Sequence, residues 1–139
     1  MKILLDTNVI LDIALQREPF VAHAIDVLRI AQHRRFALFV TATTITDLYY
    51  IARKAKGREN ALGFLRELLQ FVEVAGVDRQ VIVDALQSDM IDFEDAVQDY
   101  AAQRAGITMI ITRNQADFTQ SACDIHTPES FGRAFRLVA

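Results

Sequence analysis

The chain has 139 residues, of which 52% are hydrophobic and 24% charged, and its formal net charge is −3. This balance predicts one globular domain over residues 1–139 with a substantial core, and the acidity argues against a general nucleic-acid binder. No apolar run approaches the ~18 residues of a membrane-spanning helix, and Asp6 interrupts the first run too early for a signal peptide. Because the single cysteine cannot form an internal disulfide, we expect a cytoplasmic protein.

The N-terminal part of the chain passes directly from a strand pattern to a helix pattern. A short apolar run at 3–5 ends at Asp6, and apolar residues resume at helical spacing over about 9–15. Pro19 suits the first turn of the next helix, whose apolar stripe runs over 21–31.

The middle of the chain continues this alternation. The predicted elements are, in order, a strand at 36–40, a helix at about 45–55, a helix at about 61–69, a strand at 71–74 and a helix at about 79–87. Gly57 separates the two adjacent helices, and Thr44 with Asp47 has the spacing of a capping box at the start of the first.

The C-terminal part holds the most strongly apolar strand. A helix is predicted from Asp92 to near Gly106, and the strand follows at 107–112. A short fifth strand is expected around Ile125, and Thr127-Pro128 opens a last helix that continues through Phe131, Phe135 and Leu137. Strands that alternate with helices predict a three-layer α/β/α sandwich around a parallel sheet of four to five strands.

Acidic residues occur at four strand-to-helix junctions, namely Asp6, Asp47, Asp95 and Asp117. Any one of them could simply cap a helix, because a carboxylate is stabilised at a helix N-terminus. Right-handed crossovers, however, bring all such junctions to one edge of a parallel sheet. Carboxylates that converge there would repel one another without a cation, and oxygen ligands favour Mg²⁺ or Mn²⁺. We therefore predict a divalent metal site, with no histidine ligand.

Five stretches together resemble the PIN-domain family of metal-dependent ribonucleases. They are Leu5–Asp12, Thr46–Arg53, Asp92–Gln98, Ile111–Phe118 and Thr127–Phe131. Their order and spacing match the family along essentially the whole chain. The resemblance implies a PIN-like fold and a metal held by Asp6, Asp47, Asp95 and Asp117, and it points to the bacterial VapC-like toxin branch.

The chain departs from the family pattern at two positions. Asp47 stands where Glu is more usual, so its shorter carboxylate is expected to reach the metal through water. Asn114 stands where many members have Asp, so Asp117 is expected to supply the charge there.

The implied activity is endoribonucleolytic hydrolysis by metal-activated water, which leaves 5′-phosphate and 3′-hydroxyl ends. Supporting or phosphate-binding roles are expected for six further residues, Thr7, Asn8, Asp92, Thr112, Arg113 and Asn114. Asp12 and Asp99 are interpreted as members of solvated helix faces. The toxin branch also implies an antitoxin protein that covers the acidic cleft, and a homodimer in which Tyr49 and Tyr50 could take part.

Two other function classes remain open at this point. A phosphotransfer protein also gathers acids at a sheet edge, but a receiver domain needs an Asp after its third strand and a late Lys, and no Lys follows Lys56. A haloacid-type phosphatase needs Asp at position 8, which is Asn. The second class is a PIN-like module that binds RNA or a protein without cleaving, which would not require clustered acids.

Overall fold

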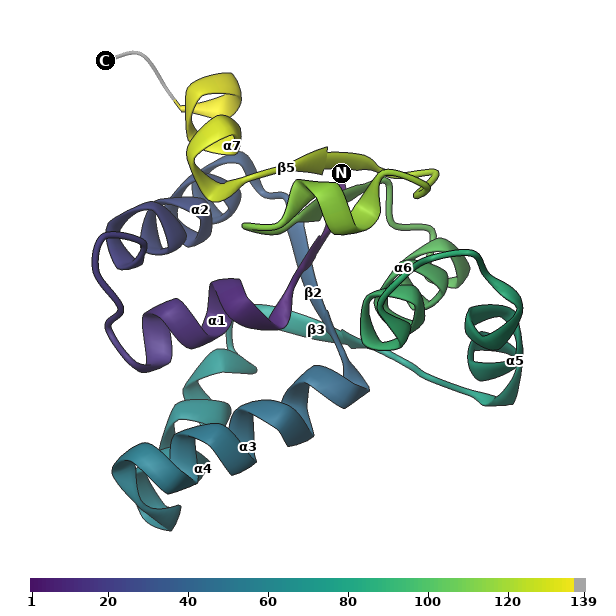
Figure 1. Ribbon diagram of the computed structural model, residues 1–139. Helices are drawn as coiled ribbons and strands as arrows, with labels where there is room; N and C mark the ends of the chain where they lie inside the picture. Colours follow the sequence, from purple (N-terminus) through teal and green to yellow (C-terminus); the bar gives the residue numbers. More distant parts are fainter. Residues whose placement is uncertain (137–139) are drawn as a thin grey trace.

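The computed structural model describes residues 1–136, which form five strands and seven α-helices with one short 3₁₀ helix, η1 (Figure 1). The strands are β1 (Lys2–Leu5), β2 (Ala37–Thr41), β3 (Val72–Ala75), β4 (Met109–Ile111) and β5 (Asp124–His126). The helices are α1 (Thr7–Ala14), α2 (Val21–Arg34), α3 (Ala42–Lys56), α4 (Arg58–Leu68), α5 (Arg79–Gln87), α6 (Phe93–Arg104), η1 (Gln115–Phe118) and α7 (Pro128–Phe135). None of these helices is both long enough and apolar enough to cross a bilayer.

All strand pairs are parallel, and the sheet order is β3-β2-β1-β4-β5. The chain builds outward from β1 to β3 and then returns to place β4 on the other side of β1. The β1/β4 boundary is therefore the point where the strand order reverses, and in open α/β sheets ligands bind outside the carboxyl ends of the strands at such a point. A receiver domain has the order 2-1-3-4-5 instead, so the topology excludes that alternative.

Helices cover both faces of the sheet, as the predicted three-layer sandwich requires. Ile3 and Leu5 face a core that includes residues of α1, α2, α3, α4 and α7, whereas Leu4 faces the opposite core with Ala102 of α6. This division follows from the period-two alternation of side chains along a strand. Helix α5 packs on α6 through a third cluster that includes Val81 and Val97. In Figure 1, α5 and α6 accordingly lie on one side of the sheet and the remaining α-helices on the other.

The predicted elements are all present, but several of their ends differ. Helix α3 begins three residues earlier than predicted, because Thr41 rather than Thr44 caps it, accepting a hydrogen bond from the Thr44 amide at 3.3 Å. Thr44 instead shares its hydroxyl with Thr7 on α1, at 2.8 Å. The predicted Thr44–Asp47 capping box was therefore wrong. Pro19 lies before α2, which begins at Val21, and not in its first turn.

The strand predicted at 107–112 is shorter than its apolar run. The Ile107 amide donates to the carbonyl of Ala102 at 2.9 Å and so closes helix α6 instead of joining the sheet. Strand β4 begins at Met109.

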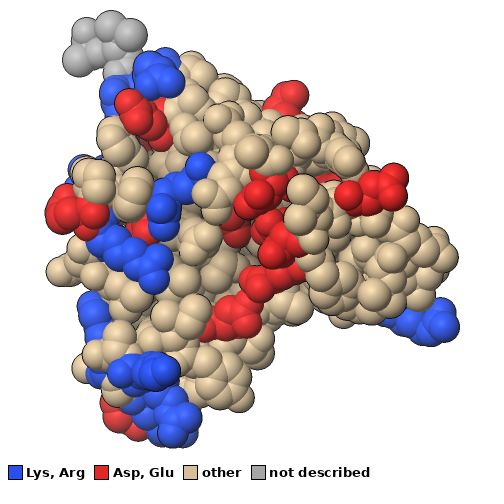
Figure 2. Space-filling view, viewed as in Figure 1, with Lys and Arg blue, Asp and Glu red and all other residues tan. Residues whose placement is uncertain are grey.

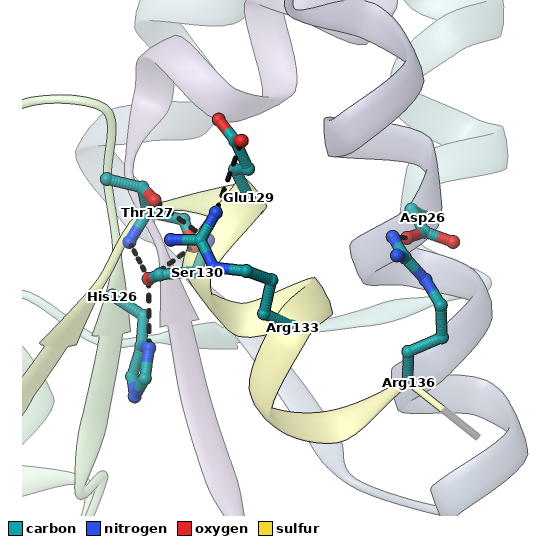
Figure 3. A network of polar contacts seen from close by, with 7 residues as sticks. All are labelled: Asp26, His126, Thr127, Glu129, Ser130, Arg133 and Arg136. Carbon is teal, nitrogen blue, oxygen red and sulfur yellow. Dashed lines mark hydrogen bonds and ion pairs between the residues drawn. The ribbon is translucent and has the colours of Figure 1, made fainter. Parts of the chain in front are cut away.

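Helix α7 is fixed at both ends, as Figure 3 shows. Thr127 and Ser130 form a reciprocal capping box at its start, and the Ser130 hydroxyl also contacts Nδ1 of His126 at 3.0 Å. Beyond its last residue, Arg136 pairs with Asp26 of α2. Leu137, predicted to continue this helix, lies outside the described residues.

Candidate functional site

An acidic cleft of about 380 Å³ lies outside the carboxyl ends of β1 and β4. Six carboxylates and no lysine or arginine line it within the described part of the chain. The lining residues are Asp6, Thr7, Asn8, Leu11, Asp47, Ile51, Asp92, Glu94, Asp95, Asn114 and Asp117. Figure 2 shows acidic side chains in a band across the middle of this face, with basic side chains to the left and below. The structure therefore brings the four predicted acidic junctions together.

Asp6 is the most constrained of these acids. The register pairs Leu5 with Ile111, so Asp6 comes to lie beside Thr112. Thr112 Oγ1 donates to Asp6 Oδ2 at 2.7 Å, and Gln98 Nε2 donates to Asp6 Oδ1 at 3.0 Å. Asp6 is 4% exposed and occupies the N-cap position of α1, yet its side chain makes no capping hydrogen bond. Its carboxylate is thus held toward the cleft and does not serve the helix.

The first turn of α6 carries three more of the acids. Asp92 does cap this helix, accepting from the Asp95 amide at 3.0 Å. Burial raises the pKa of Asp95 to about 7, with further contributions from the negative charges of Asp6, Asp92, Asp117 and Glu94. These acids therefore already oppose one another's ionisation in the absence of a cation.

The opposite wall of the cleft comes from α3. The pKa of Glu94 is raised to about 7, first by burial and then by the hydrogen bond and negative charge of Asp47. Asp47 of α3 and Glu94 of α6 therefore lie near each other in the lining of the cleft. Asn114 and Asp117, which follow β4, complete the site at its exposed end.

The predicted supporting residues do not all have the same position in the structure. Asn8 and Asp92 line the cleft as expected. Thr7 lines it too, but its hydroxyl ties α1 to α3 through Thr44. Thr112 is fully buried; its hydroxyl donates to Asp6 and accepts from the Asn114 amide at 3.0 Å, so it orients both residues.

Arg113 lies outside the cleft and contacts a buried acid on α1. Its Nε and Nη2 atoms meet the carboxylate of Asp12 at 2.8 and 3.2 Å. Asp12 is completely buried, which contradicts the predicted solvated helix face. The same prediction is wrong for Asp99, which is 2% exposed and bonds to Ser121 and Gln103. A polar residue on a helix is solvated only when no other segment of the chain packs over it. Arg113 packs over Asp12, and the 119–123 loop packs over Asp99.

Two residues of the site were not predicted, Glu94 and Gln98. Gln98 is 1% exposed and carries one of the two hydrogen bonds that hold Asp6. The available signal was spacing, since Glu94 and Gln98 are four residues apart and so share one face of α6 with Asp95 nearby.

The donor set suits a hard divalent cation. Carboxylate and amide oxygens are ligands that Mg²⁺ and Mn²⁺ accept. The raised pKa values of Glu94 and Asp95 reflect burial first and the neighbouring negative charges second. Among residues 1–136, no three Asp, Glu, His or Cys side chains already form an ion-binding group. The match to a cation therefore rests on donor type and charge.

Comparison with known proteins gives the family. A family model described as a PIN domain matches residues 2–116. The chain belongs to the PIN-domain family. This PIN domain is 25% identical over 135 residues to ribonuclease VapC1 of Aquifex aeolicus (strain VF5), an alignment that covers 94% of the chain and 92% of the relative.

Solved structures of similar fold include VapBC complexes and a VapC toxin. One is VapBC2 from Rickettsia felis bound to a promoter DNA fragment (TM-score 0.72, 15% identity, covering 91% of this PIN domain and 98% of that chain). A second is DNA-bound VapBC from Salmonella typhimurium (TM-score 0.69, 21% identity, covering 92% and 98%). A third is Mycobacterium tuberculosis VapC20, described as a Sarcin-Ricin loop cleaving toxin (TM-score 0.62, 15% identity, covering 78% and 86%). At these identities the likeness concerns the fold.

Proposed function

We propose that this PIN domain is a metal-dependent endoribonuclease and the toxin of a toxin–antitoxin pair. The observation that carries the proposal is the acidic cleft, in which six carboxylates converge and Asp6 is held by two buried donors. Relatedness to the VapC ribonucleases supports the choice of RNA as substrate.

Asp6, Asp95, Asp47 and Asp117 are the residues proposed to hold Mg²⁺ or Mn²⁺, with Glu94 as a further ligand. A cation bound there supplies activation of water and neutralises charge that develops on the phosphate. Gln98 and Thr112 keep the Asp6 carboxylate in one orientation. Asn8 and Asn114 offer neutral amides at the rim, where a phosphate oxygen can accept a hydrogen bond without meeting another negative charge.

The test is hydrolysis of single-stranded RNA with Mn²⁺, with Mg²⁺ and with chelator, in protein free of host nucleases. Asp6→Asn and Asp95→Asn should each slow cleavage by about 100-fold or more, because a lost ligand removes the activated water. Asp78→Asn is the matched control, since Asp78 caps α5 outside the cleft. Either cleft variant cutting at the wild-type rate would contradict the assignment. RNA binding without any cleavage would favour the non-cleaving module.

An antitoxin protein is proposed as the partner, with a homodimer as the toxin's own assembly, both in the cytoplasm. The solved relatives that are toxin–antitoxin complexes support the partner. Tyr50 is 63% exposed and packs edge-on against half-buried Tyr49, so this pair offers an aromatic contact surface beside the cleft. Light scattering across micromolar concentrations tests the dimer, and a monomer throughout would overturn it.

A further inference from the structure

A second hollow, of about 370 Å³, adjoins the acidic cleft. Asn114 lines both, so the two hollows adjoin at that residue. The walls of the hollow come from Phe20 and His23 on one side, Arg113 on another, and the first turn of α7 on the third. The volume lies in the range of pockets that bind small organic groups. Unlike the acidic cleft, this hollow is lined by an aromatic ring and a guanidinium.

Arg113 is held rigidly in the wall of the hollow. Its Nη2 donates a hydrogen bond to Asp12, and its Nε lies within ion-pair distance of the same carboxylate. Asp12 is buried completely and also lies 3.7 Å from a guanidinium nitrogen of Arg17. Burying a carboxylate is costly unless it is paired. Here its pairing fixes the plane of a guanidinium at the molecular surface, where the Arg113 side chain is 26% exposed. Two arginines share one carboxylate, so the cluster of Arg113, Asp12 and Arg17 has one net positive charge, and Arg113 is its member in the lining of the hollow.

The guanidinium lies against an exposed aromatic ring. Arg113 Cζ is 4.0 Å from the centroid of the Phe20 ring, and Phe20 is 38% exposed. On the third wall, Glu129 is engaged by Arg133 within α7, and the capping box holds that turn in place (Figure 3). The Phe20 and Arg113 walls of the hollow therefore meet as a stacked pair of one ring and one guanidinium.

We propose that this hollow binds one nucleobase of the single-stranded RNA, next to the phosphate that lies in the acidic cleft. The inference rests on the proposed function and names a base-binding subsite for it. Bases of single-stranded RNA stack on aromatic side chains and on guanidinium planes. Arg113 and Asn114 are consecutive, about 3.8 Å apart at their Cα atoms, so a strand that passes Asn114 reaches the stacked pair within one nucleotide.

Charge favours RNA as the occupant of this hollow. The cleft itself repels a phosphodiester chain wherever no cation compensates its carboxylates. The net positive cluster of Arg113, Asp12 and Arg17, of which Arg113 lines the hollow, attracts the backbone. A strand held there by one stacked base would thus present its neighbouring phosphate to the acids.

The experiment measures RNA binding by fluorescence anisotropy in an Asp95→Asn background with Mg²⁺. The probes are fluorescein-labelled hexauridine and six versions of it that each carry one abasic ribose. Phe20→Ala should weaken binding of hexauridine by roughly 5- to 150-fold, the effect of losing one base–aromatic stack. For the abasic hexamer that lacks the stacked base, Phe20→Ala should change nothing further.

Phe20→Tyr keeps the ring and should retain binding. Phe71→Ala is the control, because Phe71 is also exposed (49%, against 38% for Phe20) and lies outside the hollow. Thermal melts establish that each variant is folded. Undiminished binding by Phe20→Ala, or the same loss for all seven hexamers, overturns the subsite, and so does a parent protein that does not bind hexauridine. The subsite is also overturned if Phe20→Ala binds hexauridine normally and loses only the binding of a co-purified protein. Absence of hydrolysis by the wild type overturns the proposed function instead and leaves the binding result standing.

Discussion

The side-chain amide of Gln98 donates to Oδ1 of Asp6 at 3.0 Å, joining the middle of α6 to the end of β1 across 92 positions of sequence. Both side chains are almost completely buried, and the side-chain oxygen of Gln98, Oε1, has no hydrogen-bond partner among the described residues. Gln98 thus directs its donor at the acid while its own acceptor goes unsatisfied. This arrangement makes Gln98 a positioning residue for Asp6.

We predict that Gln98→Leu slows RNA hydrolysis by about 10-fold, the effect of a charge-assisted hydrogen bond worth roughly 1.5–3 kcal/mol in part offset by relaxation. The unfolding free energy should fall by only about 1 kcal/mol, because leucine also removes the unsatisfied oxygen. Gln103→Leu is the control, since Gln103 lies on the same helix and bonds to Asp99 instead. Equal rates for the two variants would show that Asp6 needs no such support.

Thermal melts separate a cation site from a set of helix caps. At pH 8 in chelator, Asp95→Asn should raise the melting temperature, because it removes one of several opposed charges. Mn²⁺ at about 100 times its dissociation constant should add roughly 2.7 kcal/mol to the wild type and little to the variant. Asp78→Asn should behave like the wild type under both conditions, because Asp78 caps α5 and pairs with exposed Arg104 outside the cleft. If wild type and Asp95→Asn have the same melting temperature in chelator and the same shift with Mn²⁺, the acids act only as helix caps.

Stability of the metal-free protein should fall as the pH rises. Folding raises the pKa of Glu94 from 4.5, and that of Asp95 from 3.8, to about 7 in each case. The folded state therefore holds these protons at pH values where the unfolded state has lost them. Their stabilising contribution is full below about pH 4 and is lost by about pH 7. Urea unfolding in chelator across this range should show a decline that Glu94→Gln/Asp95→Asn flattens. Parallel curves for the two proteins would refute this prediction.

Breaking the ion pair between buried Asp12 of α1 and Arg113 should lower the free energy of unfolding. Asp12→Asn leaves the Arg113 guanidinium without its carboxylate, and such losses destabilise by about 3–5 kcal/mol. Because Arg113 is partly exposed, we expect the lower end of that range. Asp26→Asn removes the partner of exposed Arg136 and should cost less than about 1 kcal/mol. Urea unfolding compares the two, and a loss below 1 kcal/mol for Asp12→Asn would show that water solvates Arg113 equally well.

The arrangement of strands and acids could be predicted from sequence because both follow from local pattern. Apolar runs ended by Asp6 and Asn114 mark the carboxyl ends of strands, and parallel topology gathers such ends at one edge. The fate of Asp12 could not be predicted, because its partner Arg113 is 101 residues away. Gln98 escaped notice for a similar reason, since a glutamine on a helix is ordinarily exposed. Long-range pairing decided each of these cases.

The two donors that hold Asp6 come from residues 92 and 106 positions later in the chain. A chain still under synthesis therefore has no oriented Asp6 until Thr112 has emerged from the ribosome, and Asp117 follows later still. At about 5–20 residues per second, the first acid is made several seconds before the last. If the protein cuts RNA, its own messenger and the ribosome that reads it remain safe from that particular molecule during most of its translation.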